Sequence, residues 1–286
     1  MSDDASVDFY ESSPEFVRTW SDARLTISSG LWQGVDGDDG DDLDRAQTRK
    51  LELIADLAEL GPGGRVLDIG CGYGGLLDFA VRRRKAGNAL GVTTSFAQAR
   101  HIKSMGDPAI SVLHVDFWDL PLETGGFDAV VAVQSLENVL AGAPPELTGA
   151  FAALREMFRR VHALTAPGGR FAAEVCVAGP NGAPDVHRQF EAEVLDNSQP
   201  GTMPRVGDLL NAAEGLWEPL SVTIQSEDFV RTLDAGASRL ASREAEARRL
   251  GGDDLYRATC ETVRGTTAAV RGGIMRVAWI AWKRTD

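Results

Sequence analysis

The chain reads RVLDIGCGYGG from Arg65 to Gly75. Val66 to Ile69 form a short apolar run that a single carboxylate interrupts, and a cluster of glycines follows at once. After Gly75 the apolar residues recur at helical spacing. We therefore predict a buried strand, a tight turn and the start of a helix. Glycines let backbone N–H groups approach a ligand closely, and the first helical turn adds unsatisfied N–H groups. This turn is therefore suited to a nucleotide-like ligand.

The class of ligand depends on Asp68, which lies two residues before the first glycine of the turn. Gly70, Gly72 and Gly75 satisfy the G-x-G-x-x-G spacing of dinucleotide sites. A nicotinamide or flavin dinucleotide, however, would place its pyrophosphate against the turn, where Asp68 would repel it. A carboxylate here suits a ligand that presents an ammonium group and no phosphate, as S-adenosylmethionine does. An NAD(P)-dependent oxidoreductase remains an alternative.

Two motifs carry a resemblance to a known family. The run Val66–Gly75 resembles the first motif of class I S-adenosylmethionine-dependent methyltransferases. The run Gly91–Gln98, GVTTSFAQ, is similar to the second-strand motif of a narrower group. That group contains cyclopropane fatty acid synthases, sterol and prenyl-diphosphate C-methyltransferases and small-molecule natural-product methyltransferases. The resemblance covers residues 25–180 well and the rest of the chain in outline, and it implies S-adenosyl-L-methionine as the cofactor.

Strands and helices alternate through the middle of the chain. Hydrophobic patterning predicts strands at 65–69, 89–93, 110–115, 127–134 and 171–177, and helices at 75–85, 96–105 and 146–164. Repeated strand–helix units with apolar strands indicate a parallel sheet with helices on both faces. Together with the resemblance, this predicts an α/β fold: a doubly wound, mostly parallel seven-stranded sheet of the Rossmann-like methyltransferase type.

Helices are also expected before this core. An amphipathic helix is predicted at 43–60, and Ser28–Trp32 falls where the family closes a segment over the methionine end of the cofactor. We therefore expect an N-terminal helical cap over 1–60 and a cofactor-binding core over 61–180.

The remaining residues, 181–286, are expected to complete the same structural domain. The pattern predicts a helix at 206–217 and the last two strands at 220–225 and 274–282. Between those strands, 228–272 is too long for a hairpin, so we expect a helical lid with breaks near Gly236 and Gly251–Gly252.

The resemblance assigns the methionine end of the cofactor to the glycine turn and to the end of the fourth strand. Asp68, Gly70 and Gly72 would hold the methionine portion, and Gln134 would contact its amino-acid end. Gln134 and Asn138 carry no ionisable group, so bicarbonate-assisted cyclopropanation is disfavoured.

The resemblance places the adenosine portion at the ends of the second and third strands. Asp116 would accept the adenine amino group, and Phe117 would cover the ring. Many class I enzymes bind the ribose with a carboxylate at the end of the second strand. Here Thr93 and Thr94 end that strand and Gln98 follows one helical turn later, so hydroxyl and amide groups would take that role.

Methyl transfer to a hydroxyl or an acidic carbon also needs a proton acceptor within hydrogen-bond reach. Glu174 is the first candidate, because a carboxylate inside an apolar strand must have a partner or a role. Glu137, just after the fourth strand, is the second candidate. His187, in a later loop, is the third, since imidazole titrates in the useful range.

Composition excludes several partners. The net charge of −13 disfavours nucleic acids and anionic membranes, both of which attract basic surfaces. The acidic N-terminus predicts no signal peptide, and three cysteines without metal or disulfide spacing suit a reducing cytoplasm. The Asp/Gly-rich run at 36–44 lacks the glutamate that closes a calcium loop, so we predict a solvated loop and no metal.

These observations predict a cytoplasmic methyltransferase for a small, largely apolar natural-product intermediate, methylated on carbon, oxygen or nitrogen. A second enzyme class remains open: the same fold could bind the cofactor and catalyse cyclisation or another rearrangement without methyl transfer. The only expected partner is a small-molecule substrate; the oligomeric state is not predicted, and a homodimer is possible.

Overall fold

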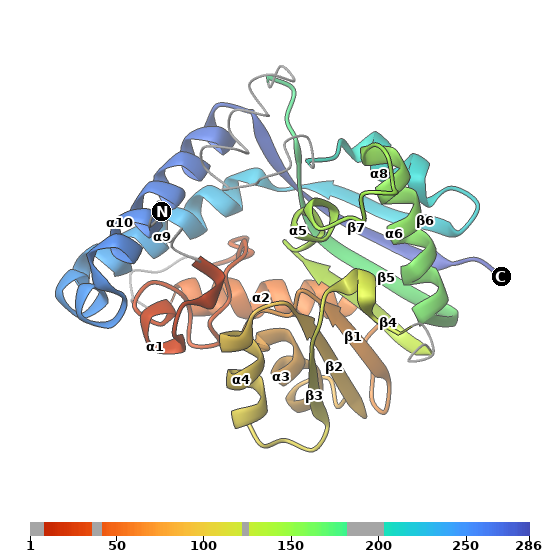
Figure 1. Ribbon diagram of the computed structural model, residues 1–286, viewed down its shortest axis with the longest axis horizontal. Helices are drawn as coiled ribbons and strands as arrows, with labels where there is room; N and C mark the ends of the chain where they lie inside the picture. Colours follow the sequence, from red (N-terminus) through yellow and green to blue (C-terminus); the bar gives the residue numbers. More distant parts are fainter. Residues whose placement is uncertain (1–8, 36–41, 122–125, 182–202) are drawn as a thin grey trace.

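A computed structural model describes residues 9–35, 42–121, 126–181 and 203–286 of the chain. Its centre is a seven-stranded sheet in the order β3-β2-β1-β4-β5-β7-β6 (Figure 1). The strands are β1 (Arg65–Ile69), β2 (Asn88–Thr93), β3 (Ile110–His114), β4 (Phe127–Val133), β5 (Thr165–Ala178), β6 (Trp217–Ile224) and β7 (Met275–Arg284). The first five strands pair in parallel, whereas β7 runs antiparallel to both β5 and β6. The predicted fold class is confirmed.

The strand order reverses beside β1, because β2 lies on one side of it and β4 on the other. In open α/β sheets the loops leaving such neighbours diverge and open a crevice beyond the carboxyl ends of the strands. The glycine turn that follows Ile69 begins at this point. The topology therefore places the glycine turn where a ligand would bind.

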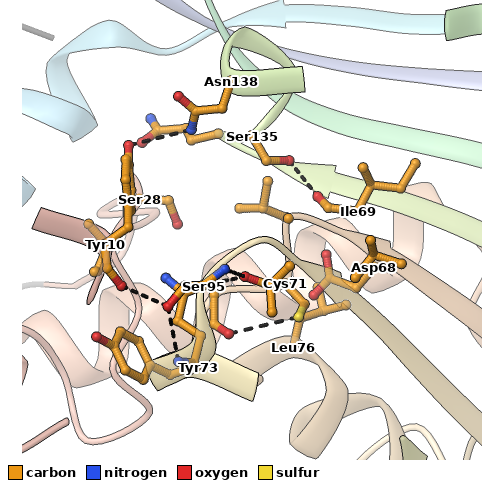
Figure 2. A pocket seen from close by; sticks show the side chains of 18 of the residues that line it. Tyr10, Ser28, Asp68, Ile69, Cys71, Tyr73, Leu76, Ser95, Ser135 and Asn138 are labelled. Carbon is orange, nitrogen blue, oxygen red and sulfur yellow. Dashed lines mark hydrogen bonds between the residues drawn. The ribbon is translucent and has the colours of Figure 1, made fainter. Parts of the chain in front are cut away.

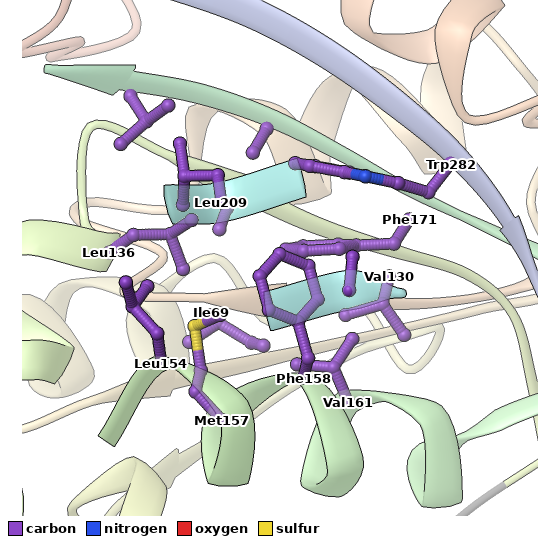
Figure 3. Close-up of a cluster of buried hydrophobic side chains, with 14 of the residues drawn as sticks. Ile69, Val130, Leu136, Leu154, Met157, Phe158, Val161, Phe171, Leu209 and Trp282 are labelled. Atoms are coloured by element: carbon purple, nitrogen blue, oxygen red, sulfur yellow. The ribbon is translucent and has the colours of Figure 1, made fainter. Parts of the chain in front are cut away.

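Helices cover both faces of the sheet. One face is covered by α5 (Leu136–Ala141), α6 (Ala150–Leu164) and α8 (Val206–Ala213), and its core contains a group of aromatic rings (Figure 3). Phe171 of β5 stacks on Trp282 of β7 with ring centroids 5.1 Å apart, and Phe158 of α6 meets the Trp282 ring edge-on at 5.3 Å. The same cluster contains Leu136 and Leu140 of α5, so this core anchors the helix that leads back to the crevice.

The other face is covered by α2 (Asp42–Leu57), α3 (Gly75–Arg82) and α4 (Phe96–Ser104), with part of the lid. The helix α2 buries a stripe that includes Ala46, Leu51 and Ile54, as the amphipathic pattern predicts. Gln47 and Lys50 lie in the same stripe and are also buried.

The N-terminal segment and the lid pack on each other. The segment contains the short helices η1 (Phe9–Glu11) and α1 (Pro14–Val17). The region predicted to form a lid, which keeps that name below, consists of α9 (Ser226–Ser242) and α10 (Glu244–Arg271). Phe16 and Val17 share an apolar cluster with Leu240 and Leu255 of the lid. Figure 1 shows the lid helices side by side at the edge of the molecule where the N-terminal segment lies.

Several predicted boundaries need correction. The helix predicted from 146 begins at Ala150, because Gly149 has φ +96° and cannot be helical. The helix predicted at 206–217 ends at Ala213, and Trp217 already belongs to β6. The lid does turn at Gly252 (φ +77°), but Gly236 lies within α9, and the lid helices part instead at Arg243.

None of the helices in the described residues is both long enough and apolar enough to cross a membrane.

Candidate active site

A cavity of about 320 Å³ opens at the carboxyl ends of β1, β2 and β4 (Figure 2). Its wall comes from the glycine turn, the ends of β2 and β4, the segment after β3, the start of α5, two residues of α2 and parts of the N-terminal segment. Every residue assigned to the cofactor from the sequence lines it: Asp68, Gly70, Gly72, Thr93, Thr94, Gln98, Asp116, Phe117 and Gln134. The structure thus brings together residues that are up to 66 positions apart in the chain.

The glycine turn is held against β2 and β4. The N–H groups of Gly70 and Cys71 both donate to the carbonyl of Val92, at 2.9 and 3.0 Å. Gly70 has φ +71°, and a Cβ added there would lie 2.4 Å from the Cβ of Ser135. Gly72 also has a positive φ (+52°), but an added Cβ would meet nothing within 4 Å. Gly70 is therefore required by packing, whereas Gly72 leaves open space at the cavity.

Asp68 is the main ionisable group of the wall. Its side chain is 2% exposed, and its Oδ1 has no hydrogen-bond partner among the described residues. Burial raises the pKa of Asp68 to about 7, and the positive charge of Lys50 limits that rise. A buried carboxylate oxygen without a donor is costly, so this geometry suits a ligand that brings one.

Lys50 of α2 is a wall residue that the sequence analysis missed. It is fully buried, and its Nζ donates to the Oγ of Ser28 at 2.6 Å. Burial lowers the pKa of Lys50, and the negative charges of Glu174, Asp22 and Asp68 oppose this effect. A signal was present in the sequence, because position 50 falls on the apolar stripe of α2, where a lysine needs a reason to be buried.

The residues assigned to the ribose form hydrogen bonds with one another. Thr93 Oγ1 donates to Gln98 Oε1 at 2.6 Å and accepts from the N–H of Ser95 at 3.1 Å. Ser95 in turn caps α4, since its Oγ accepts from the N–H of Gln98. The tight network fixes the end of β2 and leaves Thr94 beside it on the wall.

The residues assigned to the adenine and to the amino-acid end of the cofactor also have structural roles. Asp116 caps a short 3-10 helix, η2 (Phe117–Asp119), by accepting from the N–H of Trp118 at 2.8 Å. Gln134 adopts φ +47°, its N–H donates to the carbonyl of Glu174 at 2.6 Å, and its buried Nε2 has no partner among the described residues. Such a strained, non-glycine backbone is often found at functional sites.

An N-terminal strap, residues 10–12, lies across the cavity. The Oγ of Ser95 donates to the carbonyl of Tyr10 at 3.0 Å, and the hydroxyl of Tyr73 donates to the carbonyl of Ser12 at 2.6 Å. At the opening, Asn138 Nδ2 donates to the hydroxyl of Tyr10 at 3.4 Å (Figure 2). The strap therefore covers the cavity between α4 and α5.

Neither of the two proposed proton acceptors that the structure describes, Glu174 and Glu137, lies on the cavity wall. Glu174 is fully buried behind the wall, where its Oε1 accepts from the N–H of Ser29 at 2.9 Å. Burial raises the pKa of Glu174 to about 7, against the charge of Lys50. Glu137 accepts from the N–H of Cys176, and burial raises its pKa as well. His187 lies outside the described residues.

The wall fits S-adenosylmethionine better than a dinucleotide. Asp68 offers an unpartnered acceptor to an ammonium group, and Gln134 offers an unpartnered amide donor. Hydroxyl and amide groups surround the end of β2. Among the described residues, no group of three or more His, Cys, Asp or Glu could hold a metal ion; most of the Asp/Gly-rich run lies outside them.

Comparison with known proteins gives consistent results. The family model for mycolic acid cyclopropane synthetase matches residues 2–280. Cyclopropane mycolic acid synthase 2 of Mycobacterium tuberculosis (strain CDC 1551 / Oshkosh) is 26% identical over 92% of this chain and 88% of its own length. The cyclopropane synthase MmaA2 from Mycobacterium tuberculosis superposes with a TM-score of 0.80 at 20% identity, covering 97% of both chains. Coclaurine N-methyltransferase, bound to N-methylheliamine and S-adenosylhomocysteine, superposes with a TM-score of 0.72 at 18% identity. The superposition covers 96% of this chain and 80% of that chain.

Proposed function

The chain belongs to the mycolic acid cyclopropane synthetase family, and from this premise we propose that it methylates a small, largely apolar natural-product intermediate. The family contains S-adenosylmethionine-dependent methyltransferases and cyclopropane synthases, so the protein is an enzyme and S-adenosylmethionine is its cofactor. This sets aside the NAD(P)-dependent oxidoreductase. The acceptor and the roles of individual residues are part of the proposal.

The observation that carries the proposal is the unpartnered Oδ1 of Asp68 on the cavity wall. An ionised carboxylate there would bind the α-ammonium group of the methionine portion, and Gln134 would bind its carboxylate. The glycine turn would pass close to the same portion at Gly70 and Gly72. A pyrophosphate would have to lie against the charge of Asp68, which the geometry does not favour.

The other wall residues would hold the adenosine. Asp116 would accept from the adenine amino group and Phe117 would cover the ring, while Thr93, Thr94 and Gln98 would bind the ribose hydroxyls. The cofactor supplies an electrophilic methyl group on a sulfonium, so the protein mainly has to exclude water and align the acceptor. The N-terminal cap over 1–60, which contains the strap, and the lid within 181–286 would exclude water.

An acceptor that is a hydroxyl or an acidic carbon must also lose a proton. We assign this role first to Glu174, because a carboxylate with a pKa of about 7 accepts a proton at neutral pH. Since Glu174 lies behind the cavity wall, the proton would reach it through a group or a water molecule on the wall. Glu137 is the second proposed acceptor, and His187 the third. An amine acceptor releases its proton more easily and would depend less on these residues.

An apolar acceptor is supported by what the relatives are named for. One relative is a cyclopropane mycolic acid synthase, and one structural neighbour is a coclaurine N-methyltransferase with a bound N-methylated amine. The chain carries a net charge of −13, which favours a neutral or cationic small molecule over an anionic one.

The proposal is tested with cofactor that carries a trideuteromethyl group. The purified protein is incubated with apolar amines, phenols and enols in one arm and with unsaturated phospholipid in the other, and products are identified by mass spectrometry. Transfer of the intact trideuteromethyl group to a small molecule is the expected result. An Asp68→Asn variant should lose binding of S-adenosylhomocysteine by roughly a hundredfold, as expected when a buried ionic contact is removed. Asp56→Asn, an exposed surface change, is the control.

Cyclopropanation is a second candidate, favoured by the 26% identity to cyclopropane mycolic acid synthase 2 over 92% of the chain. The same labelled cofactor separates the two reactions, because forming a cyclopropane from the transferred carbon loses one deuterium. A product with two deuterium atoms on an acyl chain would therefore replace our proposal. An isomerised acceptor without label would instead indicate cyclisation or rearrangement.

A further inference from the structure

We propose that Thr232 of the lid is a positioning residue for the cofactor, because it fixes the segment that continues the cavity wall. Residues 25–28 line the cavity, whereas no residue of α9, which the structure describes in full, lies on the wall. Thr232 therefore acts on the cofactor only through the residues that it holds, which directly follow Ser28. This role goes beyond the proposed function, since it concerns the cofactor and holds for any methyl acceptor.

The segment Ser28–Trp32 is held by a different element at successive residues. The N–H of Ser29 donates to Glu174 Oε1 of β5 at 2.9 Å. The N–H of Leu31 donates to the carbonyl of Ala46 of α2 at 2.9 Å. The sheet and α2 thus hold alternate residues, and the residues between them are held by the lid.

The lid holds the segment through one hydroxyl group. Thr232 Oγ1 accepts from the N–H of Gly30 at 2.8 Å and from Nε1 of Trp32 at 2.9 Å. It donates to the carbonyl of Asp228, one turn earlier in α9, at 2.7 Å. A hydroxyl has one donor and two acceptor positions, so this one is fully used. Since Gly30 and Trp32 are buried, their two N–H groups would be costly to leave without an acceptor.

Both sides of this contact are fixed. A Cβ added at Gly30 would lie 2.9 Å from the Cβ of Ala46 and 3.3 Å from Thr232 Oγ1, so the backbone here is enclosed between α2 and α9. The start of α9 is tied to the sheet, because the N–H of Val277 of β7 donates to Ser226 Oγ at 3.2 Å. Thr232 is therefore an acceptor held in place by the sheet, and the wall segment takes its position from it.

Without the hydroxyl, the segment would spend part of its time away from the arrangement that binds the cofactor, and the apparent affinity would fall by that fraction. We test this with binding of S-adenosylhomocysteine to the full-length protein, measured by calorimetry. Thr232→Val keeps the shape of the side chain and removes the acceptor, so it should weaken binding by about tenfold. Thr232→Ser keeps the hydroxyl and should restore the affinity.

Thr267→Val is the matched control. Thr267 lies in α10 of the same lid and donates to the carbonyl of Val263 at 2.8 Å, the same bond within a helix that Thr232 makes. Thr267→Val should therefore lower the melting temperature and keep the wild-type affinity. Hydrogen exchange over residues 29–32 is the second readout. It should be faster in Thr232→Val, and it should become slower when the wild type binds the ligand.

The inference is overturned if Thr232→Val speeds this exchange and binds S-adenosylhomocysteine as tightly as the wild type does, because Thr232 would then be a structural residue only. An equal loss of affinity in Thr267→Val would overturn it as well. Should Thr232→Val fail to fold, Trp32→Phe decides. This variant removes one of the two donors and keeps an aromatic ring, so it should weaken binding severalfold, and an unchanged affinity would contradict the proposed role.

Discussion

At the scale of single residues, the turn after β1 contains two glycines with similar backbones and different surroundings. Gly70 and Gly72 both have a positive φ, which L-residues adopt at a cost of about 1 kcal/mol. Only Gly70, however, is packed against a neighbouring side chain, that of Ser135. The Oγ of Ser135 also donates to the carbonyl of Ile69, so this contact ties β1 to the start of α5.

The two glycines should therefore fail in different ways when each is changed to alanine. Gly70→Ala forces Ser135 to move and should cost several kcal/mol of stability, of the order seen when a packed core is overfilled. Gly72→Ala should cost only about 1 kcal/mol but should weaken S-adenosylhomocysteine binding, because its Cβ enters the cavity wall. Thermal denaturation and calorimetry measure the two effects. Equal loss of stability in both variants would contradict this reading of the turn.

Site residues that lie at the ends of predicted strands could be found from the sequence. Asp68, Asp116 and Gln134 stand at predicted strand ends, and the topology rule for parallel sheets brings such positions together. Lys50 was missed because its place on the wall depends on a hydrogen bond to Ser28, 22 positions earlier in the chain, which the pattern of α2 does not contain. Glu174 was recognised as unusual for its strand, but only the packing shows that it lies behind the wall.

At the scale of elements, the N-terminal strap is fastened to α4 by a carboxylate. Glu11 accepts from the N–H groups of Phe96 and Ala97 at 2.8 and 3.0 Å, the first two of the helix. Anions are favoured at a helix N-terminus, where N–H groups lack partners. Burial is the largest single effect and opposes ionisation, yet the hydrogen bonds from Ala97, Ser95 and Phe96 together hold the pKa of Glu11 below its usual value. The strap thus closes the cavity through an ionic cap rather than through apolar packing.

Glu11→Ala should loosen the strap without unfolding the protein. The lost cap is worth about 1 kcal/mol, so the melting temperature should fall by only a few degrees. Hydrogen exchange at residues 10–12 and at the start of α4 should accelerate, and S-adenosylhomocysteine should dissociate several times faster. Glu15→Ala, an exposed change in the first turn of α1, is the control. Unchanged exchange in the strap would show that Glu11 does not hold it.

Elements with a strong hydrophobic period were predicted closely. Short helices, and helix breaks that depend on tertiary contacts, were not. The strand β1 has its predicted boundaries, and α4 ends one residue before its predicted end. The helix α3 begins at Gly75 as predicted but ends at Arg82, three residues before its predicted end. The helix α5 has six residues, too few to show a period. The division of the lid at Arg243 has no glycine or proline to signal it, and Gly236 stays helical because it packs against Trp20.

At the scale of the whole molecule, the cavity depends on contacts between distant parts of the chain. The strap, the glycine turn and the start of α5 meet at its opening, and Ser29 meets Glu174 from 145 positions away. The cap packs against the lid through Phe16 and Leu255. These contacts close the site only when the chain is fully folded. The class of cofactor could be predicted from the local glycine turn, whereas the methyl acceptor depends on the shape of the closed site. They also bury carboxylates, which makes stability depend on pH.

The unligated protein should lose stability as the pH rises from about 4 towards 7. The pKa of Asp68 is raised to about 7 by burial, so in this range the native state holds a proton that the unfolded state has released. Stability from this group is therefore complete below the unfolded pKa and is lost as the pH passes through the folded one; Glu174 acts with the same sign. The total effect is of the order of a few kcal/mol.

Thermal denaturation across this range, with and without S-adenosylhomocysteine, measures the effect. Asp68→Asn should flatten the curve of the unligated protein and raise its melting temperature near neutral pH, since asparagine carries no charge to bury. The ligand supplies an ammonium group, so the stabilisation that it gives to the wild type should grow as Asp68 ionises, and in the variant it should be smaller and should not depend on pH in this range. A wild-type curve that rises between pH 4 and 7, with no change in Asp68→Asn, would mean that Asp68 is not the buried acid that the ligand neutralises.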